Sequence, residues 1–392
     1  MAATRSTATG TSVGTSASAR GYSNSVRHLR SHGAFLYKRS TGQHLTLVET
    51  KGDVPEVPDE RVAEAFGVEN WPHLLHLLED GDDVVKKRVL VAMASVFKLP
   101  QDLTMCLKHG VLELIERGIA GDDPEIQALS ARVFSVILAS PMGRAEFMNS
   151  ESAIAILPVF TAAADEETAA HIYDGFLSLS RSFTGAQQLT KHSYLQVVLT
   201  HLKRSSISNS LRCRVLQLLK NLVNDGNEGT AIRAIDLDGM DLCAKYLYDD
   251  ATELRVAACD AIAAMGFVEK AKRVAVAKGI VKKLCHLLSE SKWQVAAASA
   301  GALMTIAVND DAKRAIVESD ALAVINQLLQ SPKYLVQLNT VKLVAVIASF
   351  PPARRQLSVP STEYHLRQLL SDEDALLVKS ARLALHAVQW QP

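Results

Sequence analysis

The chain has 392 residues, 48% of them hydrophobic and 5% aromatic, and its 42 basic residues balance its 42 acidic residues. No apolar run reaches the roughly 18 residues that a membrane-spanning helix needs. We therefore expect neither a membrane nor a nucleic acid as a partner. The five cysteines form no Cys-x-x-Cys pair, a pattern typical of a reduced, intracellular protein whose free thiols fill the core. They are Cys106, Cys213, Cys243, Cys259 and Cys285.

Residues 1–60 are predicted to form a basic, low-complexity N-terminal arm and linker. Sixteen of the first 20 residues are Ser, Thr, Ala or Gly, a composition that predicts disorder or an extended conformation. Residues 1–48 contain no Asp or Glu and six basic residues: Arg5, Arg20, Arg27, Arg30, Lys38 and Arg39. Three interpretations stay open for this arm. It is a tether for an acidic surface such as tubulin, a cleaved organelle transit peptide, or a tail without a partner.

From residue 61 to residue 392 the sequence repeats with a period of 41 to 43 residues. The repeated pattern ends in an apolar residue that follows small residues on a helix. That apolar residue recurs eight times, as Met93, Phe134, Phe176, Leu219, Ile262, Leu303, Val344 and Leu385. A fixed period of this length indicates a helical solenoid with one continuous core.

One unit, residues 278–308, shows the expected plan. Gly279 breaks one helix and opens the next, which carries an apolar stripe that begins at Ile280. A polar turn over 289–292 leads to a last helix, where Ala300 and Ala302 allow close helix approach. Helix breaks are also predicted at 109–110, 238–239 and 320–321, and prolines at 100, 141 and 351 are predicted to close the last helix.

Short helices such as 312–319 add a third helix to each unit. We therefore predict an all-α fold, an armadillo-type right-handed α-solenoid of about eight three-helix repeats. The units over about 150–230 are the least regular, because residues 205–210 lengthen one turn. The first helix of the first unit is predicted to be degenerate, since terminal units cap the stack.

No nucleotide-binding, hydrolase, metalloprotease or kinase motif is present, so no enzyme, catalytic residue or cofactor is expected. His73 and His76 lie three residues apart on a predicted helix, without a third metal ligand nearby in sequence. Acidic pairs at 82–83, 122–123 and 372–374 are interpreted as helix caps in turns.

The last helix of each unit is expected to line an inner surface that binds a protein partner. Two positions one helical turn apart face that surface, and in nuclear-import armadillo adaptors they carry a ladder of Trp and Asn that holds basic peptides. Here those sixteen positions contain no Trp and one Asn. The groove for basic peptides is therefore not expected. The predicted contact residues are Arg132, Asp174, Gln217, Asn221, Asp260 and Lys342.

The later units resemble the armadillo-repeat radial spoke proteins of motile cilia and flagella. The resemblance covers about residues 279–392 and is generic before them. It depends on four stretches and the C-terminal end: 300–304 (AGALM), 337–342 (QLNTVK), 351–355 (PPARR), 380–385 (SARLAL) and 390–392 (WQP). The long Ser/Thr-rich arm departs from that family.

This resemblance implies a non-enzymatic structural subunit of the axonemal radial spoke, which docks other spoke subunits and supports ciliary motility. The implied location is the axoneme of a cilium or flagellum. Two alternatives stay open. The first is a cytosolic armadillo adaptor that binds protein clients transiently, and the second is a mitochondrial protein with a cleaved leader.

Overall fold

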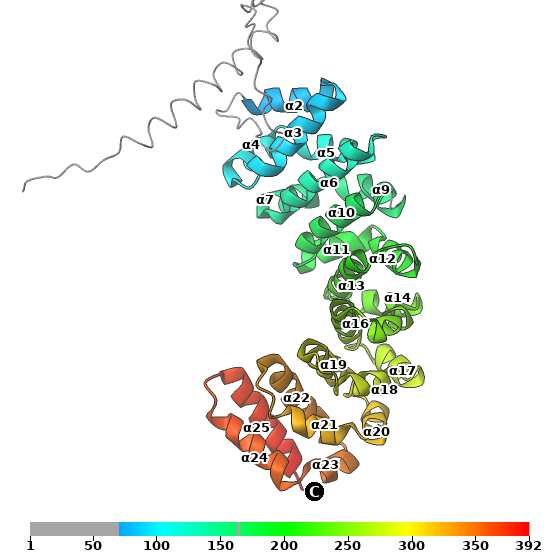
Figure 1. The fold of residues 1–392 in the computed structure, drawn as a ribbon, viewed down its shortest axis with the longest axis vertical. Helices are drawn as coiled ribbons and strands as arrows, with labels where there is room; N and C mark the ends of the chain where they lie inside the picture. Colours follow the sequence, from blue (N-terminus) through cyan, green and yellow to red (C-terminus); the bar gives the residue numbers. More distant parts are fainter. Residues whose placement is uncertain (1–69, 163–164, 392) are drawn as a thin grey trace, which may run out of the picture. The chain divides into compact units, whose positions relative to one another are not determined.

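The computed structural model describes residues 70–162 and 165–391, which contain helices and turns and no strand. The predicted arm, the linker over 51–60, the domain boundary at 60/61 and the first helix of the first unit lie outside the described residues. From Pro72 onward the described residues form one compact unit. Its helices are stacked as a regular series of repeats (Figure 1).

The last helix of each unit, called here the third helix, is present in all eight predicted places. The third helices are α3 (Asp83–Val96), α6 (Pro124–Ala139), α10 (Glu166–Leu179), α13 (Asn209–Val223), α16 (Thr252–Met265), α19 (Trp293–Ile306), α22 (Tyr334–Ile347) and α25 (Ala375–Gln389). Each contacts the next one in order, from α3 to α25. All eight repeated apolar residues, from Met93 to Leu385, are buried in this row. The predicted register is therefore confirmed.

The first and second helices complete the units. The first helices are α4 (Pro100–Lys108), α7 (Pro141–Asn149), α11 (Phe183–Lys191), α14 (Glu228–Asp236), α17 (Glu269–Ala277), α20 (Asp310–Glu318) and α23 (Pro351–Leu357). The second helices are α2 (Asn70–Asp80), α5 (Val111–Ala120), α12 (Tyr194–Lys203), α18 (Ile280–Leu287), α21 (Ala321–Leu328), the split pair α8 (Ser152–Ala155) and α9 (Leu157–Ala162), and two that end in a 3₁₀ turn, α15 (Gly239–Ala244) with η1 (Lys245–Tyr248) and α24 (Pro360–Gln368) with η2 (Leu369–Ser371).

The break between first and second helices has one backbone conformation in five units. The residue before the second helix is left-handed at Gly110 (φ 76°), Ser193 (φ 69°), Asp238 (φ 66°), Gly279 (φ 66°) and Asp320 (φ 52°). Glycine and Asp or Asn adopt this conformation at the lowest cost. The four predicted breaks are confirmed, and the break at Ser193 was not predicted.

The predicted role of three prolines was wrong. Pro100, Pro141 and Pro351 are each the first residue of a first helix, and they do not close the third helix before them. Helix α3, for example, ends at Val96, and three residues separate it from the start of α4. Proline suits the first helical position because its missing N–H has no partner there in any case.

The third unit is irregular, as predicted, but the predicted lengthening of a turn in the fourth unit is not found. The second helix of the third unit is split into α8 and α9. Five residues, 204–208, separate α12 from α13, and five residues also separate α18 from α19 and α21 from α22. The residues at 209–210, predicted to lie in that turn, belong to α13. Apolar packing there depends on aromatic side chains, with ring centroids 4.9 Å apart for Phe160–Tyr173 and for Phe176–Tyr194.

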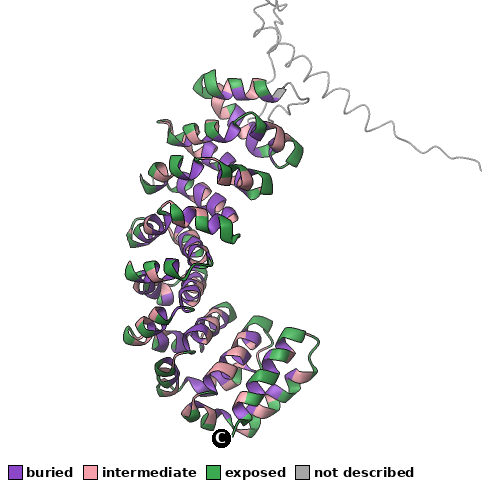
Figure 2. Cartoon of the chain, turned by 180° about the vertical axis from the view of Figure 1, so that it is seen from behind, coloured by how far each residue is buried: buried purple, intermediate pink, exposed green. Residues whose placement is uncertain are grey.

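The core lies where the helices of a unit meet each other and the next unit. Figure 2 shows buried residues along these faces and exposed residues at the helix ends and outer turns. Small residues set the helix spacing. A Cβ atom on Gly175 of α10 would lie 3.2 Å from the Leu138 and Phe134 side chains of α6, so a larger residue would push the two helices apart. Apolar burial of this kind is the main source of stability in stacked helices.

No single helix in the described segments has the length and hydropathy needed to cross a membrane. Helices α6 and α7 reach that length and hydropathy only when they are counted together, and the chain bends by 105° between them. The apolar stretch predicted as a buried core helix is α19, in which Val295, Ala300 and Leu303 are fully buried.

Candidate functional site

The six polar residues predicted to bind a partner all lie on third helices. They are Arg132 on α6, Asp174 on α10, Gln217 and Asn221 on α13, Asp260 on α16 and Lys342 on α22. None of the six is buried, and Arg132 and Gln217 are exposed. Because consecutive third helices contact each other, these side chains follow one row, which we call the third-helix row.

Helix α13 is joined to both neighbouring third helices by ion pairs in this row. Arg214 donates from Nε to Asp174 Oδ1 at 2.7 Å and from Nη2 to Asp174 Oδ2 at 3.3 Å. Lys220 donates from Nζ to Asp260 Oδ2 at 2.7 Å. Two of the predicted contact residues, Asp174 and Asp260, therefore already bind a cation within the chain.

Amide side chains make similar links between units. Asn221 donates from Nδ2 to the Ser180 hydroxyl at 3.0 Å, and Asn339 of α22 donates to the Ala297 carbonyl of α19 at 2.8 Å. Both bonds join residues 41 or 42 positions apart, one repeat period. The amide of Asn221 thus connects adjacent repeats.

The remaining three predicted residues keep their side chains available. Within the part of the chain that the structure describes, Arg132, Gln217 and Lys342 make no side-chain hydrogen bond and no ion pair. The charge of Arg132 also affects the pKa of a neighbouring histidine. Burial lowers the pKa of His171 on α10, and among nearby charges Asp174 raises it while Arg132 lowers it.

The sequence prediction missed Arg214 and Lys220, the cations that hold Asp174 and Asp260. A signal for them was present. Each cation lies 40 residues from its acidic partner, close to one period, and one period is the spacing of side chains that meet across a repeat boundary. The six basic residues predicted in the N-terminal arm, Arg5 to Arg39, lie outside the described residues.

The acidic turns act as helix caps, as predicted. Asp82 accepts a bond from the Val85 N–H at the start of α3. Asp123 accepts from the N–H groups of Glu125 and Ile126 at the start of α6. Asp374 accepts from the Leu377 N–H at the start of α25. A carboxylate at this position satisfies free amide groups and opposes the helix dipole favourably.

The cysteine and histidine positions carry no sign of metal chemistry. Among residues 70–162 and 165–391, no three His, Cys, Asp or Glu side chains cluster in a way that would hold a metal ion. His76 pairs with Asp80 at 2.9 Å, while burial and then the neighbouring His76 lower the pKa of His73. Four cysteines are buried, and burial raises the pKa of Cys106 and of Cys259 to about 12.

Comparison with known proteins identifies the fold. No protein-family model and no curated protein sequence matches this chain. Among solved structures, an engineered protein from a structural genomics consortium is similar over 85% of this chain and 94% of its own, with 20% identity and a TM-score of 0.63. A designed armadillo repeat protein is similar over 59% of this chain and 97% of its own, with 20% identity and a TM-score of 0.54.

A further designed armadillo repeat protein, solved in complex with the peptide (KR)4, is similar over 61% of this chain and all of its own length. Its identity is 20% and its TM-score is 0.54. At this identity the likeness concerns the fold alone. Together with the three-helix units and the eight stacked third helices, it shows that the described residues from 72 to 391 form an armadillo-type α-solenoid.

Proposed function

We propose that this chain is a non-enzymatic protein-binding scaffold that docks its partners on the third-helix row. The observation that carries this proposal is the set Arg132, Gln217 and Lys342. These side chains are polar, are not buried and have no partner of their own within the described residues. A solenoid core does not require polarity at these positions, whereas an interface uses such groups for specificity.

An extended stack of rigid repeats suits a scaffold, since such stacks offer long binding surfaces. A designed armadillo repeat protein of the same fold has been solved with a bound peptide, so the fold is compatible with peptide ligands. The (KR)4 peptide is not proposed as a model for the partner here, because the third-helix row of this chain carries free cations at Arg132 and Lys342.

More specifically, we propose a structural subunit of the axonemal radial spoke, located in a cilium or flagellum and docking other spoke subunits. The support is the sequence resemblance over residues 279–392. The described part of this range contains the helices α18 to α25. The N-terminal arm, with its six basic residues and no acidic ones before Glu49, is proposed to tether an acidic surface such as tubulin.

The test is fractionation of detergent-extracted, salt-washed cilia, followed by mass spectrometry of the proteins that copurify. A spoke subunit stays with the axoneme in a fixed ratio to other spoke proteins. Release by detergent would favour the alternative, a cytosolic adaptor with transient clients. Loss of the first residues together with recovery in mitochondria would favour the third interpretation.

A charge reversal separates binding from folding. Lys342→Glu should weaken copurification without lowering the melting temperature, because Lys342 makes no contact that a reversed charge would break. Asp260→Lys is a poor choice for this purpose, since it also places a second cation beside Lys220. Unchanged copurification with Lys342→Glu would show that the third-helix row at α22 is not the docking surface.

A further inference from the structure

An open groove of about 780 Å³ runs along the edge of the solenoid where third helices turn into the first helices of the next unit. Its residues come from three consecutive turns, α10 to α11, α13 to α14 and α16 to α17. These elements lie next to each other in the stack (Figure 1). We call this site the edge groove.

Two phenylalanines mark the edge groove. Phe183 is 66% exposed and Phe267 is 67% exposed, the highest values among the large apolar side chains in the described part of the chain. Both line the groove. A phenylalanine that is two-thirds exposed contributes little to folding, and aromatic side chains are enriched where proteins bind one another. Their presence at one groove indicates a binding surface.

The groove is open where α13 turns into α14, because small residues stand there at Gly226 and Ala231. The turn from α13 to α14, residues 224–227, is one residue longer than the turn at 266–268, and it contains Gly226 at φ 81°. A Cβ atom on Gly226 would lie 3.9 Å from the Phe183 ring, so the Phe183 ring packs beside bare backbone. The floor is completed by the methyl groups of Ala231 and Ala264.

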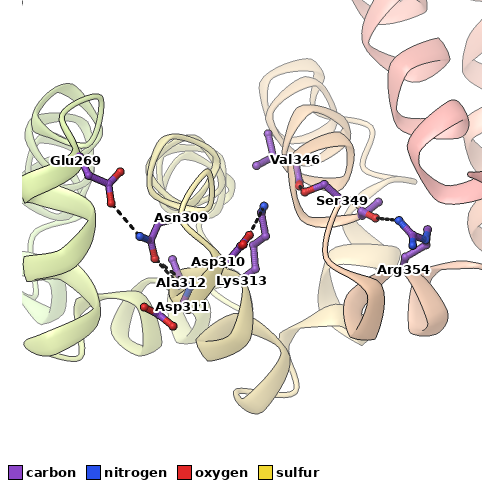
Figure 3. A network of polar contacts seen from close by, with 10 residues as sticks. Glu269, Asn309, Asp310, Asp311, Ala312, Lys313, Val346, Ser349 and Arg354 are labelled. Carbon is purple, nitrogen blue, oxygen red and sulfur yellow. Dashed lines mark hydrogen bonds and ion pairs between the residues drawn. The ribbon is translucent and has the colours of Figure 1, made fainter. Parts of the chain in front are cut away.

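Comparison of first helices shows what Ala231 leaves out. Ala231 is the fourth residue of α14, and the fourth residues of α17, α20 and α23 are Lys272, Lys313 and Arg354. Figure 3 shows two of these long cations packed at the corresponding turns, with Lys313 paired to Asp310 at 2.8 Å. In α14 the alanine leaves that space open to the groove.

A buried carboxylate holds the groove in shape. Asp225 is 1% exposed and accepts hydrogen bonds from the Thr230 hydroxyl at 2.6 Å, the Thr190 hydroxyl at 3.1 Å and the Asn227 N–H at 2.8 Å. Its carbonyl accepts from Gln187 at 2.8 Å. This network joins α11 to the turn before α14. A groove that is ordered before binding loses less entropy when a ligand enters.

The polar groups on the rim are unused. Arg181 and Glu228 line the groove, carry opposite charges and form no ion pair with any described residue. The exposed Asn224 side chain likewise makes no hydrogen bond within the described segments, and an amide both donates and accepts. The rim therefore offers one cation, one anion and one amide around an apolar centre.

We propose that the edge groove binds an extended peptide segment of a partner protein. The segment places an aromatic or large aliphatic side chain between Phe183 and Phe267, over Ala231 and Ala264. An acidic residue on one side faces Arg181, a basic residue on the other faces Glu228, and the Asn224 amide bonds the peptide backbone. The edge groove shares Asn221 with the third-helix row, where its amide is already bonded to Ser180. It contains none of the three free residues Arg132, Gln217 and Lys342, and it rests on the proposed function only in that both sites bind proteins.

The length of the groove favours a peptide over a small molecule. Packed helices lie about 8–10 Å apart, so three consecutive turns span about 20 Å. An extended strand covers that distance with about six residues. The opposite charges on the rim complement a segment that carries both signs, and they match neither a uniformly basic nor a uniformly acidic ligand.

The experiment is selection of random peptides displayed on phage against the full chain, with affinities of the selected peptides then measured by fluorescence anisotropy. We expect enrichment of a large apolar residue flanked by one acidic and one basic residue. Phe183→Ala and Phe267→Ala should each weaken binding by about tenfold or more. Val308→Ala is the matched control, because Val308 is 58% exposed at the same turn position as Phe267, one unit later, and it should bind normally.

Two further variants test the details. Ala231→Lys should abolish binding by filling the groove, as lysine is accommodated at the corresponding positions of α17 and α20. The double variant Arg181→Glu, Glu228→Arg should select peptides with the opposite order of charges. Circular dichroism melts check that each variant folds.

Selected peptides that bind the phenylalanine variants as tightly as the unaltered chain would overturn the proposal. So would self-association of the chain that Phe183→Ala abolishes in sedimentation, because the occupant would then be a second copy. Lys342→Glu should leave peptide binding unchanged. The proposal for the edge groove and the proposal for the third-helix row can therefore be refuted independently.

Discussion

The third and fourth units should lose stability as the pH falls, because His201 is held neutral inside the aromatic core. His201 of α12 is 3% exposed, its Nδ1 lies 2.8 Å from the Tyr173 hydroxyl, and its ring lies 5.2 Å from that of Phe160. Burial, with a smaller effect of Arg204, lowers the pKa of His201 to about 4, although the Thr161 carbonyl opposes the shift.

The sign and size of the effect follow from proton linkage. An unfolded histidine titrates near its ordinary pKa of 6.5. Between that value and about 4, the unfolded chain binds a proton that the folded chain does not. The free energy of unfolding therefore falls as the pH falls below 6.5, by about 1.4 kcal/mol per pH unit. The full loss, reached near pH 4, is about 3 kcal/mol.

The assay is native-state hydrogen exchange of α10 and α12 at about pH 7 and about pH 5, corrected for the intrinsic exchange rate. A local measurement is needed because stacked repeats need not unfold in one step. His201→Gln removes the ionisable group and should reduce the loss of protection. His286→Gln, on the exposed side of α18, is the control. Equal acid sensitivity in His201→Gln and the unaltered chain would refute the reasoning.

Three further predictions concern the backbone, the ion pairs and the thiols. Gly279→Ala should lower the free energy of unfolding by about 1 kcal/mol, measured by urea titration. The reason is its positive φ alone, since nothing lies within 4 Å of the added methyl group. Gly121→Ala, at φ −71°, should lower the free energy of unfolding by less. A double-mutant cycle of Lys220→Ala and Asp260→Ala should give a coupling free energy of about 0.2–1 kcal/mol that decreases with added salt. The reason is that the two side chains are 40% and 37% exposed. A coupling free energy that salt leaves unchanged would contradict this prediction. A chromogenic disulfide reagent should modify Cys213 first, as the other four cysteines are buried; early modification of a buried cysteine, mapped by mass spectrometry, would show that its unit opens.

The repeat period was the most informative property of the sequence. It located all eight third helices, because the apolar residue at each repeat must face the same interior and therefore recurs at one spacing. It also located the breaks before the second helices at Gly110, Asp238, Gly279 and Asp320. Pro100 and its equivalents were assigned to the wrong helix, since a proline that follows one helix closely can also begin the next.

The candidate site was predictable in part. That Arg132, Gln217 and Lys342 would be accessible followed from their position on the third helix relative to the buried register. The ion pairs of Asp174 and Asp260 did not follow, because they depend on which rotamer reaches across the boundary between units. The edge groove was not predicted at all. It arises because Gly226 and Ala231 lack large side chains, and because side chains from three separate turns come together.

The amino-acid sequence by itself determined the helical class, the number of units and the positions of the helix breaks. These features depend on local periodicity and on backbone preferences, which are properties of residues close to each other in sequence. Only the tertiary structure decided which polar side chains are already paired, which remain free, and where the stack opens into a groove. Those properties depend on distances between residues about 40 positions apart, and such distances are set when the units pack against one another.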